Sequence, residues 1–278
     1  MPVRQITIAH SPDSDDAFMF YALATNKLQT GNLKFRHVLN DIETLNQKAL
    51  SGEYEITAVS FHAYAYLADK YLLLNSGASM GDRYGPMVVS QVPLKPGKLK
   101  GKTIAVPGLR TTAFLILKLF ELDFIPRVVS FDKIFEIVLK GQADAGLIIH
   151  EGQLTYAALG LQKVLDLGEW WHKATQLPLP LGGNIVRRDL GPELITQISA
   201  LLRKSIQYGL DHREEALNYA MQFAKELDPT LADKFVGMYV NERTLRYGEP
   251  ERKALRLLLD MGCKRGIIGS PVHLEFAE

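Results

Sequence analysis

The side chains best suited to chemistry in this chain stand where an apolar run ends. The run Ala145 to Ile149 has the length and branched content of a buried strand, and it stops abruptly at His150 and Glu151. In open α/β sheets, ligands bind just beyond the carboxyl ends of strands, and a histidine placed there can take up a proton near neutral pH. The alternative is a structural histidine, hydrogen-bonded at a strand end, and this stretch taken alone favours that alternative.

Two threonines form a second candidate site, because they open a predicted helix directly after a turn. Thr111 and Thr112 follow the turn Pro107 to Arg110. Backbone amides and hydroxyls at a helix start bind anions, so this arrangement predicts a carboxylate ligand, with Arg110 as a further source of positive charge. The alternative is simple N-capping by Thr111, and a capping residue can also contact a ligand.

Three acidic residues cluster at the corresponding place near the start of the chain. Asp13, Asp15 and Asp16 precede a predicted helix, Ala17 to Leu23, and one of them suffices as its cap. Carboxylates suit the hydroxyls of a sugar better than they suit an anion. The cluster lacks the glycine and the distal glutamate of a calcium loop, so no metal is expected. The pattern leaves open which of the three contacts a ligand.

Ser60 ends a third predicted strand, Ile56 to Ser60, where it can hydrogen-bond a ligand. It lacks the Gly-x-Ser-x-Gly surroundings of a nucleophilic serine, so we do not predict a nucleophile here. Ala58 and Val59 precede Ser60 on the same strand, and we predict that they line the same site.

The elements that must position these residues alternate between strand and helix. Strands are predicted at Ile6 to Ala9, Leu33 to Leu39 and Ile56 to Ser60, with helices between them, which is the pattern of a parallel sheet. The pattern then returns, and Ile8-Ala9 matches Ile104-Ala105 96 residues later. Any parallel α/β protein shows some echoes of this kind, but their order predicts two similar lobes whose strand ends line one cleft. The second set of predicted strands is Thr103 to Val106, Arg127 to Val129 and Ala145 to Ile149.

Two crossings between the lobes are needed if the C-terminal part of the chain returns to the first lobe. Pro86 to Gln91 is predicted to lead out and Leu181 to Arg188 to lead back, with glycines that can absorb a hinge motion. Lobe 1 would comprise residues 1–89 and 187–278, and lobe 2 residues 90–186. Apolar residues with helical spacing predict four later helices, at Glu193 to Leu210, Arg213 to Leu227, Leu231 to Met238 and Glu251 to Met261.

Composition excludes several classes of function. The 278 residues carry a net charge of +1 without a basic block, so no nucleic acid partner is expected. Cys263 is alone, so the chain can form no internal disulfide. We find neither a secretory leader nor an uncharged stretch long enough to span a bilayer, and therefore expect a soluble, cytoplasmic protein without a membrane partner. The oligomeric state is not predicted.

Longer segments of the chain carry a family resemblance. Over nearly its whole length the sequence resembles the 1,4-dihydroxy-6-naphthoate synthases of the futalosine route to menaquinone. Each segment alone would be a weak signal, but together they are specific. The segments are Ser11 to Phe20, Ser60 to Ala65, Ser76 to Asp82, Ile149 to Tyr156 and Leu177 to Asn184.

The resemblance implies an α/β fold of two lobes, like a type II periplasmic binding protein, with a central cleft and two hinge crossings. It implies a lyase that converts cyclic de-hypoxanthine futalosine, which carries an aryl carboxylate and a sugar-derived ring, to 1,4-dihydroxy-6-naphthoate with release of dihydroxyacetone. Neither a redox cofactor nor a metal is implied. In the family, the histidine matching His150 is the proposed proton acceptor, and the residues matching Ser60, Thr111 and Thr112 lie at the substrate site.

Our hypothesis at this point is that His150 abstracts a proton, for which a positioned base typically contributes roughly 10²- to 10⁴-fold. Thr111 and Thr112 would hold the carboxylate, and Ser60 and Asp13 would orient the sugar-derived part. Two alternatives remain. One is a chorismate dehydratase of the same pathway on the same fold, and the other is a small-molecule binding protein without catalysis, since function lives in the site. The stretch around His150 favours the naphthoate synthase.

Overall fold

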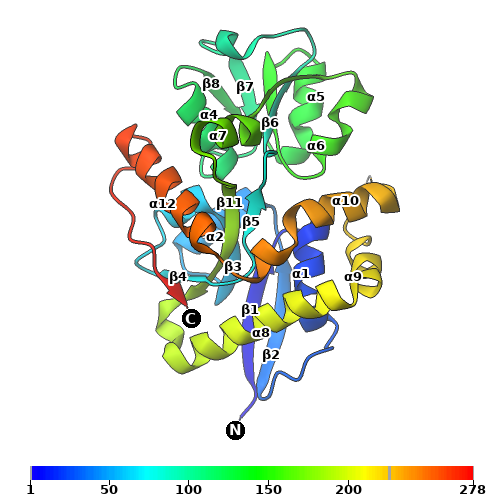
Figure 1. Ribbon diagram of the computed structural model, residues 1–278, viewed down its shortest axis with the longest axis vertical. Coiled ribbons are helices and arrows are strands. Elements are labelled where there is room, and N and C mark those ends of the chain that lie inside the picture. The colour runs from blue at the N-terminus through cyan, green and yellow to red at the C-terminus, as the bar shows by residue number, and fades with distance from the viewer. Residues whose placement is uncertain (1, 225–226, 278) are drawn as a thin grey trace.

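The chain folds into two lobes, each built on its own β-sheet (Figure 1). The computed structural model describes residues 2–224 and 227–277. Both ends of the chain contribute strands to the first sheet: β1 (Arg4–His10), β2 (Leu33–Leu39), β3 (Ile56–Ser60), β4 (Tyr71–Leu74), β5 (Ser79–Gly81), β11 (Leu179–Arg187) and β12 (Phe276–Ala277). Their order is β12-β4-β11-β3-β1-β2, with β5 paired to β11. β1 is parallel to β2 and β3, whereas β11 runs antiparallel to β3.

The second sheet is formed by one continuous part of the chain. Its strands are β6 (Met87–Ser90), β7 (Thr103–Val106), β8 (Ile125–Val128), β9 (Ala145–Ile148) and β10 (Gln162–Asp166). Their order is β10-β6-β9-β7-β8, and β7 is parallel to both of its neighbours. The parallel trio β9-β7-β8 therefore repeats the order of β3-β1-β2, as the internal match in the sequence predicts.

Helices cover both sheets. They are α1 (Ser14–Ala24), α2 (Ile42–Leu50), α3 (Phe61–Tyr64), α4 (Thr112–Phe120), α5 (Ile134–Leu139), α6 (Gly152–Thr155), α7 (Leu167–Thr175), α8 (Pro192–Asp211), α9 (Arg213–Ala220), α10 (Pro229–Tyr239), α11 (Glu242–Leu245) and α12 (Glu249–Lys264). Short 3-10 turns occur at Pro96–Lys98, Phe131–Lys133, Tyr156–Leu159 and Arg188–Leu190. The long helix α8 lies along the first lobe, and α10 reaches the junction between the lobes (Figure 1).

Apolar burial fixes these elements in place. The strands β3 and β9 are buried at every residue, as expected for strands covered on both faces. Behind the first sheet, Ile8 and Phe18 pack in one cluster with Ile198 and Leu202 of α8. Each such side chain contributes roughly 1.5–3 kcal/mol when it leaves water. The C-terminal helices therefore complete the core of the first lobe, which the N-terminal residues alone could not close.

Each predicted strand and helix is present in the structure with its ends displaced by at most three residues, except for one helix that is shorter. The strands β2, β3 and β7 have the predicted bounds. The helix predicted at Arg213 to Leu227 is shorter, because α9 ends at Ala220. Lys225 and Glu226, which fall within that prediction, lie outside the described residues.

Sheet membership locates the two crossings between the lobes. β6 pairs with β9 and β10, so it belongs to the second sheet, while β11 pairs with β3, β4 and β5 and belongs to the first. The boundaries expected at 89/90 and 186/187 thus fall inside β6 and β11. A division by backbone pairing would instead place them between β5 and β6 and between β10 and β11, and we propose that division of the lobes.

Among the helices of the described residues, none combines the length and the apolar character needed to cross a membrane.

Candidate functional site

The main pocket lies between the lobes, where the strand ends of both sheets meet. It encloses about 740 Å³, counting the part that is open to solvent. All the residues singled out from the sequence for this site except Arg110 line it: Asp13, Asp15, Asp16, Ala58, Val59, Ser60, Thr111, Thr112 and His150. The structure thus places these predicted residues around one pocket, and their roles toward a substrate stay a prediction.

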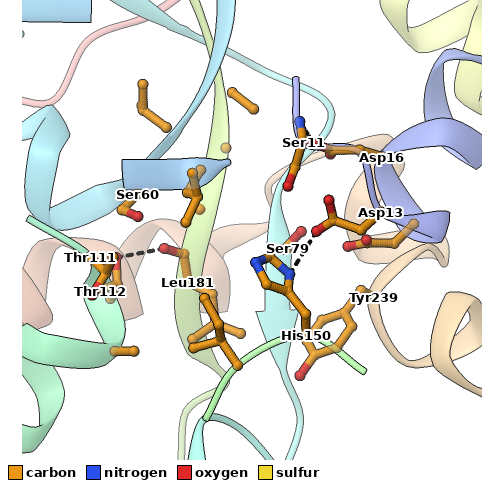
Figure 2. A pocket seen from close by; sticks show the side chains of 18 of the residues that line it. Ser11, Asp13, Asp16, Ser60, Ser79, Thr111, Thr112, His150, Leu181 and Tyr239 are labelled. Carbon is orange, nitrogen blue, oxygen red and sulfur yellow. Dashed lines mark hydrogen bonds and ion pairs between the residues drawn. The ribbon is translucent and has the colours of Figure 1, made fainter. Parts of the chain in front are cut away.

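His150 and Asp13 form an ion pair across the cleft. The Nδ1 atom of His150 lies 2.6 Å from Oδ2 of Asp13, and the two side chains point toward one another (Figure 2). The other ring nitrogen of His150, Nε2, is buried and has no hydrogen-bond partner within the described part of the chain. His150 also has a φ of +54°, in the left-handed region that non-glycine residues seldom adopt. The backbone is thus held in a strained form that turns the ring toward the first lobe.

Asp13 occupies the N-cap position of α1 but does not cap the helix. Its side chain accepts no hydrogen bond from the first turn of that helix. Instead the carboxylate faces His150, so the residue that we predicted to orient part of a ligand bridges the two lobes. The same contact shifts the pKa of both groups. Burial raises the pKa of Asp13, but the charge and hydrogen bond of His150 outweigh it and lower that pKa overall. Burial likewise lowers the pKa of His150, yet the Asp13 carboxylate more than offsets it and raises the pKa to about 10.

The pKa values of the neighbouring acids are raised, whereas that of Asp13 is lowered. Burial, together with the charge on Asp13, raises the pKa of Asp16 to about 7, although the carboxylate accepts a 2.8 Å hydrogen bond from the Ser11 amide. Burial and the same charge also raise the pKa of Glu151, which accepts a 3.3 Å hydrogen bond from the Ser14 hydroxyl. One negative charge, that of Asp13, is thus favoured in this corner of the pocket, and further charges are disfavoured.

The two threonines lie on the opposite side of the pocket, beside Ser60 (Figure 2). Their hydroxyl protons are already used. Thr111 donates to the Gly108 carbonyl at 2.9 Å and caps α4 by accepting from the Phe114 amide. Thr112 donates to the Leu181 carbonyl at 2.5 Å. Neither hydroxyl can donate to a ligand without breaking one of these bonds.

Other donors remain at this end. The amides of Thr112 and Ala113 belong to the first turn of α4, where a helix offers no internal acceptor. The Ser60 hydroxyl accepts a 3.2 Å hydrogen bond from Asn46 Nδ2, which leaves its proton to be donated elsewhere. The Asn46 oxygen in turn accepts from the Ser60 amide at 2.9 Å and fixes the serine. Backbone amides and one hydroxyl are therefore the donors available to bind an anion at the threonine end of the pocket.

Arg110 does not contribute to the site. Its guanidinium lies over the Tyr66 ring, 4.7 Å from the centroid, and the residue is not part of the pocket lining. Among the described lining residues, His150 is the one side chain that can carry a positive charge. The predicted extra charge near the threonines is therefore wrong, because a cation–π contact holds the arginine elsewhere.

His62 forms hydrogen bonds with both threonines. Its amide donates to the Thr112 hydroxyl at 3.2 Å, and its Nδ1 donates to the Thr111 carbonyl at 3.3 Å. Burial lowers the pKa of His62 to about 4, so the ring is neutral at ordinary pH. These bonds join the two lobes at the threonine end, as the ion pair of His150 joins them at the other.

Sequence reasoning missed several residues that line the pocket, and it missed Asn46, which holds Ser60 without lining the pocket itself. Tyr239 of α10 donates a 2.9 Å hydrogen bond to the Gln153 side chain of α6, and both line the pocket. Asn46 is fully buried within an otherwise amphipathic helix, and that polar residue on an apolar face was the available signal. Nothing in the sequence near Tyr239 shows that α10 folds back over the cleft.

The remaining walls are mostly apolar, which suits a flat ring system. They are formed by Ile42, Ala58, Val59, Pro86, Ala113, Ile149, Leu181 and Phe235. In the part of the chain that the structure describes, no three His, Cys, Asp or Glu side chains gather as a metal site would need.

Comparison with solved structures agrees with this architecture. The alkanesulfonate-binding protein SsuA from Xanthomonas axonopodis pv. citri, solved with bound MOPS, matches with a TM-score of 0.74 at 13% identity, over 98% of this chain and 96% of that one. A crystal structure of a protein from Archaeoglobus fulgidus matches with a TM-score of 0.90 at 50% identity, over 95% of this chain and 98% of that one. The fold is therefore that of the two-lobed periplasmic binding proteins, here with a histidine–carboxylate pair in the cleft.

Sequence comparison narrows this class to a family. The family model described as menaquinone biosynthesis matches residues 6–264. A relative from Thermus thermophilus, named 1,4-dihydroxy-6-naphtoate synthase, is 41% identical over 265 residues, which are 95% of this chain and 96% of the relative. The chain belongs to the menaquinone biosynthesis family, and it is an enzyme of that family. The resemblance noted in the sequence is confirmed.

Proposed function

We propose that the protein is a carbon–carbon lyase that converts cyclic de-hypoxanthine futalosine to 1,4-dihydroxy-6-naphthoate and dihydroxyacetone. The observation that carries the proposal is the pairing of His150 with Asp13 at one end of a pocket whose other end offers amide and hydroxyl donors that have no acceptor among the described residues. The reaction needs a proton removed from carbon, and it needs the aryl carboxylate held away from the reacting centre. The two ends of the pocket supply these two requirements separately.

The base in this proposal is neutral His150. With Nδ1–H donated to Asp13, the free lone pair of the imidazole is on Nε2, the nitrogen that has no partner in the described protein. Because the pKa of His150 is raised to about 10, the imidazolium predominates in the free protein at pH 7. The reactive form is then a minor one, so kcat/KM should rise as the pH rises toward that value. Asp13 keeps the tautomer fixed and makes Nε2 more basic.

The carboxylate would be bound at the start of α4. The amides of Thr112 and Ala113 and the hydroxyl of Ser60 are the donors that remain, and the helix dipole favours a negative charge there. The threonine hydroxyls position the backbone through Gly108 and Leu181. The apolar walls would flank the ring as it becomes aromatic, and closure of the lobes would exclude water from the reacting centre.

The test is incubation of the purified protein with cyclic de-hypoxanthine futalosine and, separately, with chorismate. Formation of the naphthoate chromophore with stoichiometric dihydroxyacetone supports the proposal. Consumption of chorismate alone would identify a dehydratase, and binding of either compound without turnover would identify a binding protein. Either of these results contradicts the lyase assignment.

A further inference from the structure

The three aspartates at the start of α1 differ in what they contact. Asp13 pairs with His150 at 2.6 Å, and Asp16 accepts a hydrogen bond from the Ser11 amide at 2.8 Å. Asp15 is 7% exposed, and its Oδ1 is buried without a hydrogen-bond partner among the residues that the structure describes. Two of the three carboxyl groups are thus engaged by protein atoms, and the third is open.

An open carboxyl in this position points to a ligand. Buried polar atoms in native proteins nearly always have partners, and an unpaired one calls for an explanation. Asp15 lines the pocket beside Asp13 and Asp16. A ligand that enters this corner of the pocket would therefore reach the one carboxyl whose hydrogen-bonding capacity is unused.

The charges in this corner decide the chemistry of that ligand. Burial and the charges of Asp13 and Asp16 raise the pKa of Asp15 well above its ordinary value. A neutral carboxyl both donates and accepts a hydrogen bond, as a hydroxyl group does. An anionic group would instead meet the charge of Asp13 and the acids around it. The partner is therefore an uncharged hydroxyl rather than a carboxylate.

Resting on the proposed function, we infer that Asp15 binds a hydroxyl of the sugar-derived part of the substrate and so fixes which way the substrate lies in the pocket. The aryl carboxylate then lies at the start of α4, and the hydroxyl-bearing part lies at the start of α1, next to His150. Asp15 is a specificity residue in this arrangement, whereas Asp13 acts through His150.

The experiment combines Asp15 variants with analogues of cyclic de-hypoxanthine futalosine that each lack one hydroxyl. Asp15→Leu removes both hydrogen-bonding oxygens and keeps the branched shape of the side chain, and it should raise KM at least tenfold, with kcat changed much less. Asp15→Asn keeps one donor and one acceptor and should recover most of that loss. One analogue should raise KM for the wild type but not for Asp15→Leu, because the variant has already lost the hydrogen bond to that hydroxyl. Asp132→Leu, at an exposed aspartate of the second lobe, is the matched control and should leave KM unchanged.

Two results would overturn the inference. One is a folded Asp15→Leu protein with the KM of the wild type. The other is a rise in KM for Asp15→Leu that adds, for every analogue, to the rise caused by the missing hydroxyl. If Asp15→Leu does not fold, Asp15→Ala is measured in the same way.

Failure of the proposed function is seen separately, as absence of turnover by the wild-type protein. Calorimetric titration with the same compound then decides, because equal affinities of the wild type and the variant would overturn the role of Asp15, and weaker binding by the variant would support it.

Discussion

The starts of α1 and α4 occupy the same place in the two lobes and use their capping residues in opposite ways. Thr111 caps its own helix through the Phe114 amide, as its residue type predicts. Asp13 stands at the cap of α1, makes no capping bond, and pairs with His150 of the other lobe. A side chain at a helix start is available for contacts across the cleft when its own helix does not use it. Where local structure does use it, only the backbone remains available to a ligand.

The largest expected effect lies on the α1 side, at His150. We predict that His150→Asn lowers kcat by roughly 10²- to 10⁴-fold, because the general base is lost. Asparagine tolerates the left-handed backbone better than most residues, so the loop should keep its shape. Steady-state kinetics with the naphthoate chromophore measures the rate, and a direct titration checks that substrate still binds. A kcat near that of the wild type would show that the base lies elsewhere and would end the functional contrast between the two helix starts.

Asp13→Asn should have the next largest effect. Removing the carboxylate charge leaves burial to dominate, so the pKa of His150 falls from about 10. Since the neutral imidazole is the reactive form, the acid limb of the kcat/KM profile should move to lower pH by at least one unit. The rate on the plateau should fall roughly tenfold or more, because a weaker base removes the proton. An unchanged limb would mean that Asp13 does not set the protonation of His150.

The α4 side is tested by two substitutions at one position. Thr112→Val removes the hydroxyl and keeps the amide, whereas Thr112→Pro removes both and is tolerated in the first turn of a helix. If the amide binds the carboxylate, Thr112→Pro should raise KM roughly tenfold above the value for Thr112→Val, which corresponds to about 1.4 kcal/mol. Equal values of KM for the two variants would show that the Thr112 amide does not bind the carboxylate.

The smallest effect concerns stability. Thr111→Ala should lower the free energy of unfolding by about 1 kcal/mol at any pH from 6 to 9, because a hydroxyl cap does not titrate. Asp13→Ala should behave differently. Its partner His150 has a folded pKa raised above 6.5 to about 10, so the contribution of the pair is complete below pH 6.5 and is lost as the pH rises toward 10. Urea unfolding at several pH values separates the two patterns, and parallel pH profiles would contradict the comparison.

Much of the fold could be predicted because it depends on local pattern. β2, β3 and β7 were found with their exact bounds from apolar runs between turn residues, and the duplicated order of strands followed from matching segments. Part of the pocket lining also followed, since parallel strands place their carboxyl ends together. These inferences need no knowledge of how distant side chains pack.

The partners within the site could not be predicted in the same way. Asp13 and His150 are far apart in the chain and meet only when the lobes are placed face to face. The hydroxyl of Thr112 is used by the Leu181 carbonyl, and Arg110 is held by the Tyr66 ring. Each of these contacts depends on tertiary geometry, and each changes the role that the residue type alone would suggest.

The left-handed backbone at His150 has a consequence for variation under selection. Glycine adopts this conformation without steric cost, so His150→Gly would relieve strain at the same step that removes the imidazole. Relief of backbone strain therefore favours glycine over other replacements of histidine at position 150, and it disfavours β-branched residues most. A screen for turnover should instead retain histidine, since we propose His150 as the base.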